Sequence, residues 1–305
     1  MDTSPDCVVT MGAVRAGDSL KKTWPVVRLG YRVPRLRFDG VAHSVFDRAC
    51  NVACGDSLLT LSATRSDGPT MLVIGAATEP EFRRIFDRGD AIRCRGGVIE
   101  LRGATVDLRR ATVWRAPARR RSLGVRDVNA RLLVARARLA QVQDAQPSVI
   151  GTTTLTTELE RACRTLDGPD LVRCAGRMIG WGEGLTPAGD DYLVGLRAAL
   201  GALAQGDARR IAFLRACDAL LASAPSRTTP ISAHYLRLAA VGDFNADLLA
   251  AVDALLCEHD IDEASRAIDA ALAVGATSGA DALAGIVSGF AAWAECPSPL
   301  HGGNA

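Results

Sequence analysis

The hydrophobic pattern changes its period part of the way along the chain. From Asp6 to about Pro117, short apolar runs rich in β-branched residues alternate with turn signals such as Asp39-Gly40. The runs are VVRL at 26–29, LLTL at 58–61, MLVI at 71–74 and VIEL at 98–101. This spacing predicts a β-rich, barrel-like domain. One short helix is expected within it over Glu79–Asp87, where apolar residues repeat at helical spacing.

From Val125 onward, Ala and Leu recur at spacings of three and four residues, a period that predicts α-helices. The apolar stripes are Leu132, Leu133, Leu139 and Val142, and then Leu214, Ala216, Leu220 and Leu221. An arginine-rich stretch over 109–126 separates the two patterns, and we interpret it as a solvated connector, with a basic docking patch as the alternative. We therefore predict an α+β protein with a β-rich domain over 1–118 and an α-helical domain over 119–305.

The composition indicates which classes of partner the protein does not bind. The 36 Lys and Arg residues nearly balance 34 Asp and Glu, so the net charge of +2 gives no global field for nucleic acid or an anionic membrane. The first residues show no secretion signal, and the apolar stretches are too short or too interrupted to span a bilayer. Nine cysteines without a CxxC pair indicate reduced thiols. We expect a cytoplasmic protein that binds neither nucleic acid nor membrane.

Three expected helices in the second half begin with similar residues: Thr186-Pro187, Thr229-Pro230 and Thr277-Ser278. A threonine at the N-cap accepts a bond from a free backbone N–H, and a following proline has its φ preset for the helix. The first and third starts share the pattern G-x-T-x-x-x-D, which suggests an internal duplication. If the three starts converge, their N–H groups and dipoles form a pocket for phosphate or carboxylate.

The segment GWGEGLTPAGDD, residues 180–191, carries the densest chemistry in the chain. Its glycines permit positive φ and close approach to a ligand, although they match neither the Walker pattern nor a dinucleotide fingerprint. Asp190 and Asp191 are the predicted catalytic residues, as a positioned acid or base. With Glu183 they are also the candidates for a divalent cation such as Mg²⁺. The alternative is that these carboxylates only complement the helix dipole.

The remaining predicted site residues come from the same three helix starts and are expected to bind substrate or phosphate: Gly182, Gly184, Leu185, Thr186, Gly189, Arg227, Thr228, Thr229, Ser232, Thr277, Ser278, Gly279 and Asp281. Arg227 supplies a guanidinium that can pair with an anion in bidentate fashion. Ser278 and Asp281 also fit a capping box, which is the structural alternative for that pair. His234 is interpreted as a packed helix residue.

GWGEGLTPAGDDYLVG, RTTPISAHYLRLA and GATSGADALAG resemble segments of the AllH-like family, formerly a domain of unknown function. HSVFDRACNVACGDSLLTL in the first half resembles the family's N-terminal pattern, so the resemblance covers most of the chain. It implies a subunit of the FdrA-type oxamate carbamoyltransferase, with FdrA-type and AllG-like subunits as partners. That assembly of allantoin catabolism exchanges a carbamoyl group between a ureido compound such as oxalurate and phosphate, giving carbamoyl phosphate.

Two other functions remain open from the sequence. The chain can be a non-catalytic scaffold or regulatory subunit, in which the glycine-rich motif stabilises helix packing and another surface docks a partner. It can also be a metal-dependent hydrolase that uses the carboxylates of Glu183, Asp190 and Asp191. The carbamoyltransferase interpretation predicts that the motif binds a small anionic substrate. The scaffold interpretation predicts that the motif maintains the fold, and the hydrolase interpretation predicts that a metal is bound.

Overall fold

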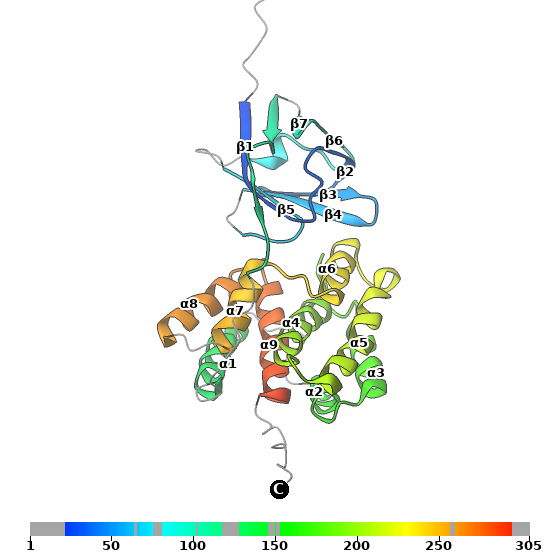
Figure 1. Cartoon of the computed structure of the whole chain (residues 1–305), viewed down its shortest axis with the longest axis vertical. Helices are drawn as coiled ribbons and strands as arrows, with labels where there is room; N and C mark the ends of the chain where they lie inside the picture. The colour runs from blue at the N-terminus through cyan, green and yellow to red at the C-terminus, as the bar shows by residue number, and fades with distance from the viewer. Residues whose placement is uncertain are drawn as a thin grey trace, which may run out of the picture.

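The computed structural model describes residues 22–63, 66–75, 81–101, 103–117, 128–145, 150, 153–256 and 260–294. Within these residues all strands precede all α-helices along the chain, and the strands and helices form two separate layers (Figure 1). The predicted α+β arrangement is confirmed. The strands end at Trp114 and the first helix begins at Val128, so the predicted boundary after residue 118 lies outside the described residues.

The four predicted apolar runs each lie in a strand. The described strands are β1 (Lys22–Gly30), β2 (Arg37–Val45), β3 (Ala49–Cys54), β4 (Ser57–Ser62), β5 (Met71–Ile74), β6 (Ala91–Arg95), β7 (Val98–Leu101), β8 (Ala104–Asp107) and β9 (Thr112–Trp114). Alternate positions face inward, as in β6, where Ile92 and Cys94 are buried between exposed neighbours. This period of two places one face of each strand in a common core.

Eight of these strands close into a barrel, in the order β5-β4-β3-β2-β6-β7-β8-β1, because β1 also pairs with β5 in antiparallel fashion. β1 is shared along its length: its first part pairs with β8, and Arg28–Gly30 pairs with β9 in parallel. The barrel is filled by its own hydrophobic core, which includes Val26, Leu61 and Val106. A filled interior leaves binding to the surfaces of the barrel.

The helix expected over Glu79–Asp87 is shorter than predicted. The structure has one turn of 3-10 helix, η1 (Phe82–Arg84), and Glu79 lies outside the described residues. Phe82 is fully buried and meets the ring of Trp24 edge-on at a centroid separation of 6.2 Å. This turn contributes an aromatic side chain to the barrel core, and packing there decides its conformation more than helical period does.

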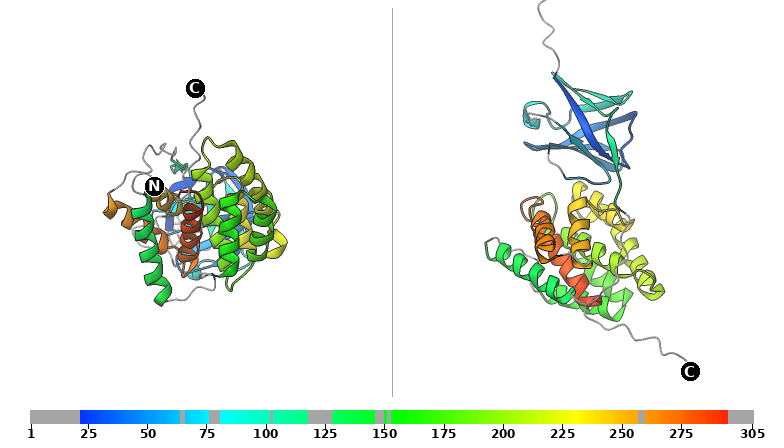
Figure 2. Two further views of the ribbon diagram at one scale, coloured as in Figure 1. Left: turned by 90° about the horizontal axis from the view of Figure 1, so that it is seen from below. Right: turned by 60° about the vertical axis from the view of Figure 1, so that its left-hand side comes forward.

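The helical layer is built around two central helices, α4 and α9 (Figure 2). The described helices are α1 (Val128–Ala145), α2 (Thr154–Thr165), α3 (Gly168–Met178), α4 (Ala188–Leu203), α5 (Ala208–Ala222), η3 (Pro225–Arg227), α6 (Pro230–Ala240), α7 (Ala246–Leu256), α8 (Ile261–Leu272) and α9 (Ser278–Trp293). In α1, Leu132 and Leu139 are buried as predicted, but Leu133 is 63% exposed. Consecutive helical residues point about 100° apart, so Leu133 leaves the apolar stripe.

Gly195 of α4 and Gly285 of α9 let the two helices touch through their backbones. A Cβ on Gly195 would collide with the carbonyl oxygen of Ala282, and a Cβ on Gly285 with that of Tyr192. The contacts are reciprocal, which makes the helix pair pseudo-symmetric with a sequence offset of 90 residues. The matching G-x-T-x-x-x-D patterns are 91 residues apart, so packing pairs Asp281 with Asp191 and not with Asp190.

The barrel and the helices are held together by polar contacts from α6 and α7. His234 is buried, its Nδ1 accepts from the N–H of Leu58 at 3.3 Å, and its Nε2 lies 3.2 Å from Thr70 Oγ1. Burial lowers the pKa of His234 to about 4, so the ring is neutral at physiological pH. Ser66 also donates to Asp247 at 2.7 Å. The interpretation of His234 as a packed helix residue agrees with this position, and its partners come from the other layer.

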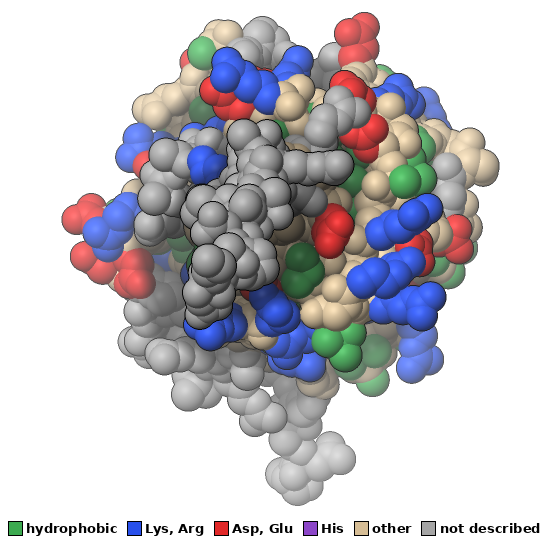
Figure 3. All heavy atoms as spheres, turned by 90° about the horizontal axis from the view of Figure 1, so that it is seen from above, with side chains coloured by type: hydrophobic (Ala, Val, Ile, Leu, Met, Phe, Trp, Pro, Cys, Tyr) green, Lys and Arg blue, Asp and Glu red, His purple; other side chains and the backbone are tan. Residues whose placement is uncertain are grey.

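The surface charge is mixed. Figure 3 shows groups of Lys and Arg side chains with acidic side chains among them on the face seen from above. Arg109, from the arginine-rich stretch, pairs with Asp107 at 2.8 Å, and this hydrogen bonding lowers the pKa of Asp107 to about 2. Arg119 to Arg121 and Arg126 lie outside the described residues. Among the helices that are described, none is long and apolar enough to cross a membrane.

Candidate functional site

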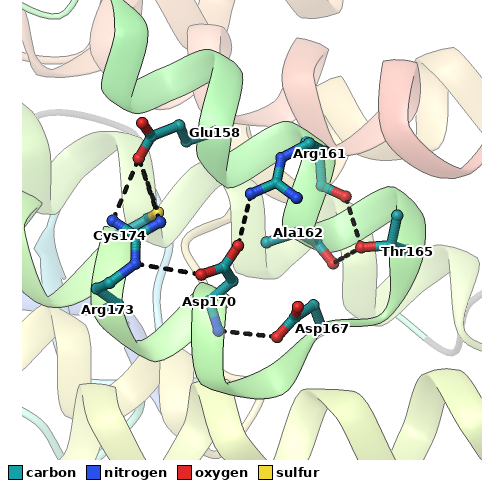
Figure 4. A network of polar contacts seen from close by, with 8 residues as sticks. All are labelled: Glu158, Arg161, Ala162, Thr165, Asp167, Asp170, Arg173 and Cys174. Atoms are coloured by element: carbon teal, nitrogen blue, oxygen red, sulfur yellow. Dashed lines mark hydrogen bonds and ion pairs between the residues drawn. The ribbon is translucent and has the colours of Figure 1, made fainter.

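The glycine-rich segment forms a loop between α3 and α4, which we call the first loop (residues 179–187). Gly180, Gly182 and Gly184 have φ angles of 76°, 114° and 95°, which side chains with a Cβ rarely adopt. Figure 4 shows how α3 is fixed before the loop, with Asp170 accepting from Arg161 of α2 at 2.6 Å. The loop therefore begins from an anchored helix and turns through three glycine-dependent positions.

Asp190 holds the first loop and the start of α6 in place. One carboxylate oxygen accepts from the backbone N–H of Gly180 at 2.9 Å. The other accepts from the hydroxyls of Thr228 and of Ser232, the latter at 2.7 Å. The side chain is fully buried and is not among the residues that line a described pocket. This is the geometry of a positioning residue that ties three segments together.

The three threonine helix starts differ in detail, and one of them is as predicted. Thr229 is the N-cap of α6, where its hydroxyl accepts from the N–H of Ser232 at 3.1 Å. The N-cap of α4 is Pro187 and not Thr186, so the predicted cap at Thr186 is wrong. Thr277 is at the N-cap position of α9 without a side-chain cap bond, and the Ser278–Asp281 capping box is not formed because α9 already begins at Ser278.

A threonine hydroxyl without a capping role is available for another contact. Thr186 Oγ1 lies 2.7 Å from Ser278 Oγ, which joins the first loop to the start of α9. Thr229, which also caps α6, donates its hydroxyl to the carbonyl of Leu185, so the start of α6 is hydrogen-bonded to the first loop. The first and third starts thus meet directly, while the middle start acts as a support for the first.

A pocket of about 470 Å³ lies where these elements meet the barrel, and we call it the interdomain pocket. The first loop lines one side, and a second loop (residues 274–277) with the start of α9 lines the other. β2–β3 residues of the barrel contribute Phe46 and Asn51, and α6 contributes Ile231 and Tyr235. Binding pockets of about 300–1,000 Å³ between domains are common sites for small ligands.

Asp191 is the most unusual group in the interdomain pocket. It is 9% exposed, and its Oδ2 is buried without a hydrogen-bond partner in the described part of the chain. Burial raises its pKa to about 8, while the hydroxyls of Ser278 and Thr186 lower it and the charges of Asp281 and Asp190 raise it further. Near pH 7 most Asp191 side chains are neutral acids, and strongly shifted carboxyl groups in pockets are candidates for acid–base catalysis.

The structure separates the predicted site residues into two groups. The interdomain pocket is lined by Glu183, Gly184, Leu185, Thr186, Asp191, Thr277, Ser278 and Gly279. Residues outside its lining are Gly182, Gly189, Asp190, Arg227, Thr228, Thr229, Ser232 and Asp281. Arg227 donates its guanidinium to the carbonyl of Gly176, so it supports the end of α3. Within the second group, Asp190 and Thr229 bond to the backbone of the first loop, and Thr228 and Ser232 bond to Asp190.

Several lining residues were missing from the sequence prediction. Asn51 accepts from Thr60 at 2.8 Å and donates to Ser44 at 3.0 Å, and Tyr235 is a half-buried wall residue of α6. Phe46 and Asn51 lie in the N-terminal segment HSVFDRACNVACGDSLLTL, so the family pattern contained a signal for them. Hydrophobic period alone could not show that β3 of the barrel faces the helix starts.

The electrostatics of the pocket differ from the predicted anion pocket. None of the described residues that line it is Lys, Arg or His. At the start of α4 the N–H of Gly189 bonds to the carbonyl of Trp181, and those of Asp190 and Asp191 bond to that of Pro187. Because these amides have acceptors within the chain, fewer N–H groups at this helix terminus are free to donate to an anion. The walls provide hydroxyl, amide and carboxyl groups.

The carboxylates of Glu183, Asp190 and Asp191 do not form a metal site in the described part of the chain. No group of three or more His, Cys, Asp or Glu side chains that could hold a metal ion is found among the described residues. Asp190 already accepts three hydrogen bonds, which occupy it as a structural acceptor. The donor set therefore does not fit the cation that the sequence suggested.

Comparison with protein families identifies the chain. Residues 178–290 match the family described as oxamate carbamoyltransferase subunit AllH, and residues 27–113 match the AllH family N-terminal domain. The chain belongs to the AllH family, whose name describes a subunit of a multi-subunit carbamoyltransferase. The first match contains the first loop, α4 and α9 as far as Phe290, and the second contains nearly all of the barrel. No solved structure matches the chain.

Proposed function

We propose that the interdomain pocket binds the carbamoyl end of a ureido substrate such as oxalurate during carbamoyl transfer to phosphate. One observation carries the proposal: Asp191, a buried carboxyl group whose Oδ2 has no partner among the described residues, lines a pocket between two loops of the region matched to the AllH subunit. Burial raises the pKa of Asp191 to about 8, so the group is a neutral acid near pH 7. A neutral carboxyl group both donates and accepts hydrogen bonds, and a ureido group offers N–H donors and carbonyl acceptors. The hydroxyl of Ser278 is a second donor beside it.

The proposed step is a displacement at the carbamoyl carbon. A phosphate oxygen forms a bond to that carbon, and the bond from the carbon to the amide nitrogen of the leaving group breaks. The leaving nitrogen takes the proton of Asp191, so an amide such as oxamate departs and carbamoyl phosphate remains. The Asp191 carboxylate then recovers a proton from solvent. Protonation of a poor leaving group by a positioned acid contributes about 10²–10⁴-fold to the rate.

Phosphate is expected to need groups from outside this chain. The described lining of the interdomain pocket supplies no cation, and a dianion is poorly accommodated beside Glu183 without one. The family is defined as one subunit of an assembly, so partner subunits can supply basic groups at the open side of the pocket. We propose FdrA-type and AllG-like chains as the partners, and we propose that the assembly acts in the cytoplasm, in allantoin catabolism.

Asp190 is proposed to act indirectly, in contrast to the catalytic role expected from its sequence position. It fixes Gly180 and the residues before α6, and through them the shape of the first loop. This observation also favours part of the scaffold alternative, because half of the aspartate pair maintains structure. The two aspartates are therefore assigned different roles, one in positioning and one at the substrate.

Oxalurate binding to the chain, alone and assembled with its partner subunits, tests the proposal by calorimetric titration. We expect saturable binding that Asp191→Asn or Ser278→Ala weakens at least tenfold. Asp144→Asn is the matched control, because Asp144 is an exposed carboxylate of α1 and lines neither the pocket nor the first loop. Equal oxalurate binding by wild type and Asp191→Asn would exclude this pocket as the substrate site. A full assembly that does not bind oxalurate would exclude it as well.

A further inference from the structure

A second cavity lies on the opposite side of the central helix pair. It has a volume of about 320 Å³, is walled by α1, α2, α4 and α9, and shares no lining residue with the interdomain pocket. Figure 1 shows α9 between α1 and α4. The sequence neighbours Asp191 and Tyr192 line one cavity each, because adjacent helical residues point in different directions. We call this second space the helical cavity.

Tyr192 marks the helical cavity as a binding site. The residue is 1% exposed, and its hydroxyl has no hydrogen-bond partner in the described part of the chain. Ser288 lies on the same wall and lowers the pKa of Tyr192, but its geometry falls short of a hydrogen bond. Burial dominates and raises that pKa, so the hydroxyl stays neutral. A buried hydroxyl without a partner is unfavourable, and a ligand oxygen at this point would satisfy it.

The rest of the wall indicates what kind of molecule fits. Leu139 of α1 and Val287 and Ala291 of α9 present apolar surface. The charged lining residues are Arg136 and Glu160, of opposite sign, and Glu160 accepts from Arg164 at 2.5 Å. Glu160 is already paired with Arg164, and Arg136 also has an interaction within the protein, so neither charge is available as the counter-ion of a charged ligand. A hydroxyl donor and an aliphatic wall together suit an uncharged carbonyl compound.

We propose that the helical cavity is a second small-molecule site, which takes an uncharged amide or other carbonyl compound with an aliphatic body. The carbonyl oxygen accepts from Tyr192, and the aliphatic part packs against α1 and α9. The volume is at the lower end of ligand pockets, so the ligand is small. This site is independent of the proposed carbamoyl transfer, although α4 and α9 form walls of both cavities.

Isobutyramide is the probe, because it combines an uncharged carbonyl with a small branched aliphatic body, and isobutyrate is its anionic counterpart. Binding to the full chain is followed by ligand-observed NMR and by the tyrosine signals of the protein. We expect saturable binding of isobutyramide and at least tenfold weaker binding of isobutyrate. Tyr192→Phe should weaken isobutyramide binding at least tenfold without unfolding the protein, because it removes only a hydroxyl that has no hydrogen-bond partner among the described residues.

Two further variants define the place of binding. Ala140→Trp, at an exposed lining residue of α1, fills the cavity and should abolish isobutyramide binding, whereas Asp191→Asn on the other side of α4 should leave it unchanged. Wild-type affinity in Tyr192→Phe, absence of saturable binding, or preference for isobutyrate would each overturn the proposal. Occupation of the cavity by water alone, in a crystal soaked with isobutyramide, would also overturn it.

Discussion

The hydroxyl oxygens of Thr186 and Ser278 lie 2.7 Å apart, and this contact joins the first loop to the start of α9 beside Asp191. Both hydroxyls lower the pKa of Asp191, against the larger effect of burial that raises it. The two hydroxyls therefore make the proposed proton donor more acidic than burial alone would make it. The spacing of the G-x-T-x-x-x-D patterns suggested related helix starts but could not show that their side chains touch.

Ser278→Ala should raise the pKa of Asp191 above about 8, because it removes a hydroxyl that stabilises the carboxylate. In the assembled carbamoyltransferase, the pH above which the transfer rate falls should move upward. Ser288→Ala, on the same helix but lining the helical cavity, is the matched control and should leave the profile in place. A downward shift, or equal profiles for the two variants, would refute this role for Ser278.

Asp190→Ala should destabilise the fold by about 3 kcal/mol, because it leaves the Gly180 N–H, the buried hydroxyl of Ser232 and the partly buried hydroxyl of Thr228 without their acceptor. The free energy of unfolding from urea titration measures this loss. Asp191→Ala removes a neighbouring carboxyl group, one oxygen of which has no partner in the part of the chain that the structure describes, and this change is expected to cost less. If Asp191→Ala were the more destabilising of the two, the division of roles between the aspartates would be wrong.

The stability of the protein should depend on pH through Asp191. Its pKa is about 8 in the folded protein and about 3.9 in an unfolded chain, so the folded state binds more protons between these values. The free energy of unfolding must then fall as pH rises from about 4 to about 8, by at most about 1.4 kcal/mol per pH unit. Asp191→Asn should remove this slope. A wild-type slope that persists in Asp191→Asn assigns the dependence to other groups.

Gly195→Ala and Gly285→Ala should each destabilise the protein by about 3 kcal/mol or more, because the added Cβ meets a backbone carbonyl of the facing helix. Thermal unfolding followed by circular dichroism measures the effect. Gly168→Ala is the control, since its Cβ would meet only Ala216 Cβ at 3.8 Å, an ordinary contact. Tolerance of alanine at both central positions would contradict the backbone contact of α4 with α9.

The strands and helices were predictable because local patterns determine them. The run MLVI coincides with β5, and Thr229-Pro230 begins α6 with the predicted cap. Local patterns do not show which way a side chain points relative to the barrel or to the neighbouring helices. Asp190 and Asp191 look equivalent in sequence, yet one turns toward Gly180 and the other toward the interdomain pocket.

The site was predictable in part for the same reason. The first loop and the start of α9 were recognised from glycine and threonine spacing, and both line the interdomain pocket. Arg227 was expected there because of its charge, but its guanidinium donates a hydrogen bond to the carbonyl of Gly176. The contribution of Asn51 depends on how the barrel packs against α6, which is a long-range property of the fold.

The pH dependence of carbamoyl transfer by the assembled enzyme, with wild type and Asp191→Asn compared, tests the central claim most directly. If Asp191 is the acid that protonates the leaving nitrogen, the wild-type rate with oxalurate and phosphate falls as pH rises through about 8. Asp191→Asn should then be about 10²–10⁴-fold slower and lack that fall. An Asp191→Asn assembly with the wild-type rate and profile would show that Asp191 is not the proton donor.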